Sequence, residues 1–98
     1  MSYQQLARLS LFQTSIPLMT SQNIVGPRVK QARREQKPTL TQDDLAAKLQ
    51  TQGWTIDRFG VSRIERGVRQ VTDKELLQLA KALSVSVGYL VGEKANGN

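Results

Sequence analysis

Residues 40–67 read LTQDDLAAKLQTQGWTIDRFGVSRIERG, and this stretch contains two short segments whose apolar residues recur at helical spacing. The first segment begins at Thr41, which is suited to cap a helix, and ends at Gly53. The second begins near Asp57, another capping residue, and ends at Gly67. The sequence therefore predicts two helices joined by a connector. Their inward-facing residues are Leu45, Ala46 and Leu49 in the first helix and Val61 and Ile64 in the second.

Helical periodicity continues on both sides of this stretch. A helix is predicted from about Gly26 to Gln36, and the Lys-Pro-Thr sequence at 37–39 breaks it. Further along, Thr72 and Glu75 have the spacing of a capping box, and a last short helix begins at Ser86. No strand is predicted. The expected fold is all-α, a compact domain of five helices.

Two short helices with a connector, flanked by a helix on each side, are typical of a helix-turn-helix, whose second helix enters the DNA major groove. Several segments also follow one another in an order found in a known family: LTQDDLA (40–46), VSRIERG (61–67), VTDKELL (71–77), LAKAL (79–83) and residues 85–90. In these segments the chain resembles the Xre family, the lambda-repressor-like DNA-binding domains of phage repressors and Cro proteins. With Arg28, Val29 and Arg33, the resemblance covers residues 24–91.

The connector between the paired helices departs from the family pattern. Leu45 to Gly67 spans about five residues more than is usual, so an extended turn is expected between the paired helices, which are the second and third of the five. Ile56 is expected to enter the core and Trp54 to cover the exposed flank of this turn. Gly60 is unusual inside a helix: it either brings the backbone close to DNA or relieves crowding beside Trp54.

Composition restricts the function independently. The 98 residues include 14 Lys and Arg against 8 Asp and Glu, a formal net charge of +6. There is no Cys and no His, which excludes disulfides, thiolate or imidazole metal sites and His-activated nucleophiles. We expect a domain that is not an enzyme and holds no metal or cofactor, and whose partner is a polyanion such as double-stranded DNA.

The expected recognition helix, residues 57–66, carries the candidate base-reading side chains. Arginine can bind O6 and N7 of guanine with both arms, so Arg58 and Arg63 are the strongest candidates, with a phosphate clamp or a solvated face as the alternatives. Phe59 either contacts a thymine methyl group or seals the long turn. The outer side, opposite Val61 and Ile64, holds Arg58, Phe59, Ser62 and Arg63.

The resemblance also implies phosphate contacts and one structural ion pair. In relatives, the Gln at the position of Gln42 donates to a DNA phosphate, and helix N-termini favour phosphate; the alternative is that it supports the helix start. An Arg of the first helix pairs in relatives with the Glu at the position of Glu65, so Arg33 and Glu65 are expected to fix the recognition helix. The further phosphate candidates are Thr41, Arg66 and Arg69.

The expected domains are an N-terminal extension at 1–23, either flexible or a dimer contact, the DNA-binding domain at 24–92 and a disordered tail at 93–98. A homodimer is expected because one helix-turn-helix reads few base pairs, and residues 89–91 or 3–12 are its candidate surfaces. The expected function is a sequence-specific transcriptional regulator, in particular a repressor. The alternative is an antitoxin or interaction subunit with a toxin partner. The sequence shows no signal peptide or membrane span, so a cytoplasmic location is expected.

Overall fold

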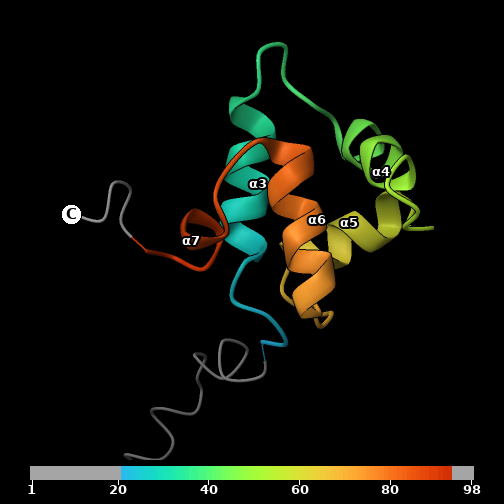
Figure 1. Cartoon of the computed structure of the whole chain (residues 1–98). Coiled ribbons are helices and arrows are strands. Elements are labelled where there is room, and N and C mark those ends of the chain that lie inside the picture. Colours follow the sequence, from blue (N-terminus) through green and yellow to red (C-terminus); the bar gives the residue numbers. More distant parts are fainter. Residues whose placement is uncertain (1–20, 94–98) are drawn as a thin grey trace, which may run out of the picture.

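The computed structural model describes residues 21–93, and this part of the chain folds into five helices without a strand (Figure 1). The predicted all-α class is therefore confirmed. Expectations about residues 1–20, which include the candidate dimer surface at 3–12, and about residues 94–98 lie outside the described residues. The helices are α3 (Gly26–Glu35), α4 (Gln42–Gln50), α5 (Arg58–Glu65), α6 (Asp73–Leu83) and α7 (Val87–Leu90).

Side-chain caps set where most of these helices begin. In each case a side-chain oxygen accepts a hydrogen bond of 2.9–3.1 Å from the backbone N–H three residues later, which satisfies a donor that the helix start leaves without a partner. At α4 and α6 the acid three residues on bonds back to the cap, so both starts are complete capping boxes. The four caps are Thr41, Asp57, Thr72 and Ser86, as the sequence predicts.

The core draws apolar side chains from all five helices. Val61 and Ile64 are fully buried, so the predicted inner face of α5 is confirmed. Leu90 is also fully buried, and Tyr89 and Val91 pack against the core. The expectation that residues 89–91 form a dimer surface is wrong for Leu90, because its side chain is already used inside the domain. The largest fully buried side chains are Leu45, Leu49, Ile64, Leu79, Leu83, Leu90, Val29 and Val61.

Helix α3 packs against α5 and also against α6 and α7. Gly26, at the start of α3, makes this close approach possible. A Cβ atom there would lie 2.5 Å from the carbonyl oxygen of Ile64 and 2.7 Å from that of Glu65. Any side chain at this position would therefore push α3 away from the end of α5.

The connector between α4 and α5 is long, as expected, and folds back on the domain. Gly53 takes a positive φ of 89°, and the side-chain amide of Gln50 donates to the carbonyl of Ile56 at 2.7 Å. Ile56 enters the core with 6% of its surface exposed, and Trp54 packs half-buried against it. Both expectations for this turn are confirmed.

Residues 21–23, which the sequence analysis assigned to the N-terminal extension, are part of the folded unit. The backbone N–H of Gln22 donates to the carbonyl of Gly67 at 2.7 Å, just after α5 ends. The side chain of Asn23 bonds to the same region. The sequence offered no apolar residue at 21–23 that would have indicated this contact.

Candidate nucleic-acid interface

Helix α5 has a buried side and an exposed side. Its buried residues are Gly60, Val61, Ile64 and Glu65, and they face α3 and α4. The exposed residues are Arg58, Phe59, Arg63 and the C-cap residue Arg66, and Ser62 is half-buried between them. Residues at this spacing share one side of a helix. The structure therefore brings together the four candidate base-reading residues and Arg66 on one open surface.

The arginines around α5 divide into two groups by their partners. Arg33 and Arg69 are held in ion pairs with Glu65 and Glu75. Arg58, Arg63 and Arg66 form no ion pair with any residue between 21 and 93. The exposed side of α5 therefore presents three cationic groups whose charge the described part of the chain does not neutralise, which is the electrostatic condition for binding a polyanion.

Two of these arginines contact a neighbouring side chain on the surface of α5. The guanidinium carbon of Arg58 lies 4.8 Å from the ring centroid of Phe59, which is 57% exposed, so the two side chains form one cationic and apolar unit. The Nε of Arg66 lies 3.4 Å from the hydroxyl of Ser62, a long hydrogen bond along the helix surface. Phe59 is thus oriented outward beside Arg58.

Glu65 ties α5 to two other helices from its buried side. Its carboxylate accepts from Nε of Arg33 at 2.7 Å and from Nη2 of the same residue at 3.0 Å, a two-armed pair between α3 and α5. The expected Arg33–Glu65 pair is thus present. The side-chain amide of Gln42 also donates to Glu65, at 3.0 Å. The sequence analysis missed this last bond because Gln42 and Glu65 are 23 residues apart.

The start of α4 offers hydrogen-bond donors beside α5. Gln42 uses one amide hydrogen for Glu65, and an amide group has a second. The Thr41 hydroxyl accepts from Asp44 as a cap and can still donate its own proton. The backbone N–H of Thr41 donates to the Asp44 carboxylate at 2.9 Å, and this bond, together with a smaller effect of the Thr41 side chain, lowers the pKa of Asp44.

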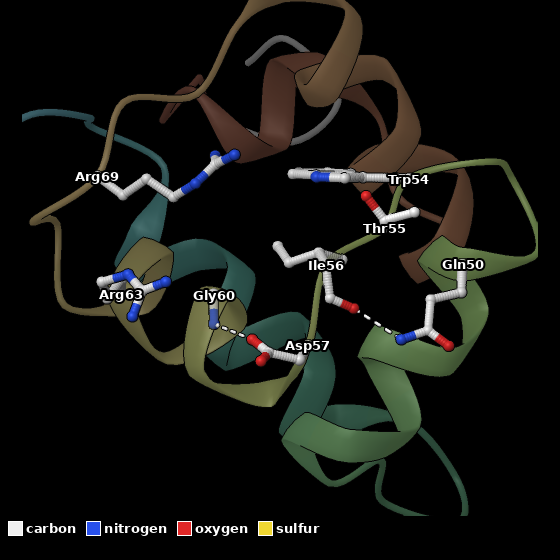
Figure 2. A pocket seen from close by; sticks show the side chains of 8 residues that line it. All are labelled: Gln50, Trp54, Thr55, Ile56, Asp57, Gly60, Arg63 and Arg69. Atoms are coloured by element: carbon white, nitrogen blue, oxygen red, sulfur yellow. Dashed lines mark hydrogen bonds between the residues drawn. The ribbon is translucent and has the colours of Figure 1, made fainter.

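A pocket of about 590 Å³ lies between the long turn and α5 (Figure 2). Arg63 and Arg69 line it on one side and Trp54 on the other, with the Arg69 guanidinium 5.4 Å from the Trp54 ring centroid. Its floor includes Gly60, where a Cβ atom would lie 2.5 Å from Cγ1 of Ile56. Gly60 therefore makes room for Ile56, whereas the sequence analysis expected it either to bring the backbone close to DNA or to relieve crowding beside Trp54.

Arg69 differs from the other phosphate candidates, because Glu75 already binds it. Nη1 and Nη2 of Arg69 donate to the two carboxylate oxygens of Glu75 at 3.0 and 3.1 Å. This contact is the main reason that the pKa of Glu75 lies below its ordinary value. Within residues 21–93 three of the five N–H groups of Arg69 make hydrogen bonds, so Nε–H and one Nη2–H are left for a phosphate.

Comparison with protein-family models matches residues 29–90 to one family, described as Helix-turn-helix. The match spans well over half of the chain and includes α4, the long turn and α5. The chain belongs to this family. Its helix-turn-helix is of the Xre, lambda-repressor-like type, so the resemblance is confirmed. Comparison with curated proteins and with solved structures finds no match.

Membership of this family indicates the general function of the protein. The family is one of DNA-binding domains and is not enzymatic, so the domain binds DNA and takes part in transcriptional regulation. Between residues 21 and 93, no three His, Cys, Asp or Glu side chains gather closely enough to hold a metal ion. None of the helices in that range has the length and apolar character needed to span a bilayer.

Proposed function

We propose that this protein is a sequence-specific repressor that binds double-stranded DNA as a homodimer, with α5 in the major groove. One observation carries the proposal: Arg58, Arg63 and Arg66 share the exposed side of α5 without an ion-pair partner among the described residues. A helix with such a side fits the major groove, where forked arginine contacts identify guanine. Repression follows most simply, because a domain bound across a promoter excludes polymerase without further parts.

We assign the contacts with DNA according to where each side chain lies on α5. Base edges are read by Arg58, in the first turn of α5, and by Arg63, further along the same exposed side. Phe59 contacts a thymine methyl group, since it is exposed and held beside Arg58. Ser62 completes the base-facing set between them.

Phosphate contacts flank this set on both sides. Thr41 and Gln42 at the start of α4 hold one phosphate with their remaining donors, which is the common use of a helix N-terminus. Arg66 and Arg69 follow α5 and face the backbone on the other side. Arg69 contributes less than Arg66, because Glu75 neutralises its charge.

The folded unit that does this spans residues 21–93 in the structure, and we assign the DNA-binding role to it. One such unit reads only a few base pairs, so two copies on half-sites about 34–36 Å apart supply the specificity of a whole site. The selected DNA sequence is therefore expected to be palindromic.

Selection of bound sequences from random DNA, followed by a mobility shift, tests the proposal. The full chain should enrich a palindrome and bind it with two copies per site. Replacing Arg58, Arg63 and Arg66 by Ala should abolish enrichment. The same charge change made at Lys48, Lys74 and Lys81, three exposed lysines on α4 and α6, should leave it intact. Equal losses in both triple variants, or a second small protein that purifies with the chain and blocks DNA, would contradict the proposal.

A further inference from the structure

Asn23, just before α3, makes four hydrogen bonds with its side chain. Its Oδ1 accepts from the backbone N–H of Val25 at 2.9 Å and of Gly26 at 2.8 Å. Its Nδ2 donates to the carbonyl oxygens of Ile64 at 3.1 Å and of Arg69 at 2.8 Å. An asparagine side chain has two donors and an acceptor oxygen with two lone pairs, so its full capacity is used.

These bonds join three segments that are far apart in the sequence. Two hold the start of α3, which has no other side-chain cap. The other two hold the last turn of α5 and the loop that follows it, on either side of Arg66. The side chain is half-buried, so water competes only partly for these bonds. Asn23 therefore connects the supporting helix to the end of the DNA-facing helix.

Neighbouring contacts strengthen this connection. The N–H of Gln22 donates to the carbonyl of Gly67, and the hydroxyl of Ser21 donates to the carbonyl of Asn23. Gly26 lets α3 approach the carbonyls of Ile64 and Glu65 closely. The end of α5 is thus held through its backbone carbonyls, and none of these bonds uses the side chains of its exposed arginines.

We infer that Asn23 is a positioning residue for DNA recognition: it sets the orientation of the end of α5 and thereby the direction of Arg63 and Arg66. The inference rests on the proposed function. A forked arginine contact discriminates between bases only when the helix is held within about 0.5 Å of its productive position. A contact to phosphate tolerates more movement, because it depends mainly on charge. Loss of Asn23 should therefore reduce discrimination more than general DNA binding.

The test compares Asn23→Asp with a matched change elsewhere, Gln36→Glu. The amide of Gln36 also donates to two backbone carbonyls, of Leu83 at 3.0 Å and of Ala32 at 3.4 Å, but it joins α3 to α6. Both substitutions remove a pair of amide donors and add one negative charge. The added charge affects specific and random DNA alike, so the measured quantity is the ratio of the two affinities, corrected for the folded fraction.

Asn23→Asp should lower this ratio about tenfold, a change that corresponds to about 1.4 kcal/mol, while Gln36→Glu should leave it unchanged. If Asn23→Asp does not fold, Asn23→Gly and Gln36→Gly provide the same comparison without the added charge. An unchanged ratio in folded Asn23 variants would overturn the inference.

Hydrogen exchange keeps this inference separate from the proposed function. The amides of residues 66–69 should exchange faster in the Asn23 variant than in the Gln36 variant, whether or not DNA is present. If the unaltered chain selects no DNA sequence, the proposed function fails and the recognition role of Asn23 fails with it. The exchange result then still shows whether Asn23 holds the end of α5. If the chain selects a sequence and the exchange is equal in both variants, only the inference on Asn23 fails.

Discussion

Arg33 and Glu65 form a buried, two-armed ion pair between α3 and α5, with Nε–Oε2 and Nη2–Oε1 distances of 2.7 and 3.0 Å. Arg33 also donates to the carbonyl of Leu40 at 2.9 Å, so the pair joins α5, α3 and the connector before α4. Both residues have only 8% of their surface exposed. Helix α5 is therefore supported by a charged contact that solvent barely reaches.

Removing one partner should be costly. Glu65→Gln should lower the free energy of unfolding by about 3–5 kcal/mol, because it leaves the Arg33 guanidinium buried without a counter-charge. Urea denaturation of the single variants and of Arg33→Met with Glu65→Leu measures this. The double variant should lose less than Glu65→Gln alone, since no charge is then left unpaired. A loss below 1 kcal/mol in the single variant would show that water reaches the pair.

Arg58→Ala should weaken binding to the selected site by about 1–3 kcal/mol and relax base preference at one position. The reason is the loss of a forked contact to a base edge rather than of net charge. Lys74→Ala, on α6, is the charge-matched control. Quantitative mobility shifts on the selected site and on random DNA measure both terms. Equal losses on the two DNAs would place Arg58 on a phosphate.

Gln42→Ala should weaken binding to all DNA sequences by the same factor and leave the salt dependence unchanged, because a neutral amide releases no counterion. Arg66→Gln should instead reduce the slope of log K against log salt by about 0.9. Binding isotherms at several salt concentrations distinguish the two. Full affinity in folded Gln42→Ala would mean that the amide serves only its bond to Glu65.

Gly60→Ala should destabilise the domain despite the higher helix propensity of alanine. The propensity gain is about 1 kcal/mol, whereas forcing a methyl group to within 2.5 Å of Ile56 costs about 1–3 kcal/mol. In an Ile56→Ala background the same substitution should become stabilising, since the blocking atom is gone. Thermal unfolding of the unaltered chain, the two single variants and the double variant measures how far the two substitutions depend on each other. Additive effects on stability would refute the contact.

Stability should fall at acidic pH partly through Glu75. Its pKa is lower in the folded state than the ordinary value of 4.5, chiefly because of the hydrogen bonds from Arg69. A lowered carboxyl pKa stabilises the fold above the unfolded-state value, and this contribution disappears as the pH falls through the folded-state value. In Arg69→Gln the pKa of Glu75 should rise and the acid dependence should flatten. NMR titration of Glu75 checks this, and an unchanged pKa would contradict it. The Asp44 cap, whose pKa is also lowered, supplies acid dependence that both chains retain.

Local rules were sufficient to predict the helices and their starts. The caps at Thr41, Asp57 and Thr72 act within three residues, and the buried pair Val61 and Ile64 follows from helical spacing. The extra residues between the paired helices predicted a long turn. They did not predict the path of this turn, because the contact between Gly60 and Ile56 depends on how α5 packs. The resemblance supplied the Arg33–Glu65 pair, which spacing alone does not indicate.

What the sequence analysis missed are bonds between polar side chains and distant backbone. Asn23 contacts carbonyls 41 and 46 residues away, and nothing in the composition around it predicts that. The one available signal was local: an asparagine three residues before Gly26, near the predicted start of a helix, is a favoured position for a cap. Arg69 and Glu75 are only six residues apart in the sequence. A loop joins them, so no helical periodicity indicates their contact.

The attachment of residues 21–23 also affects how this domain should be shortened for study. The family match begins at Val29, and the buried apolar side chains begin at Val25, so either boundary invites removal of everything before it. A chain trimmed to Val25 keeps every buried apolar residue of the described part of the chain, but it lacks Asn23. If Asn23 positions the end of α5 as inferred, this shortened chain would discriminate poorly between DNA sequences, and the cause would be the trimming and not the natural protein.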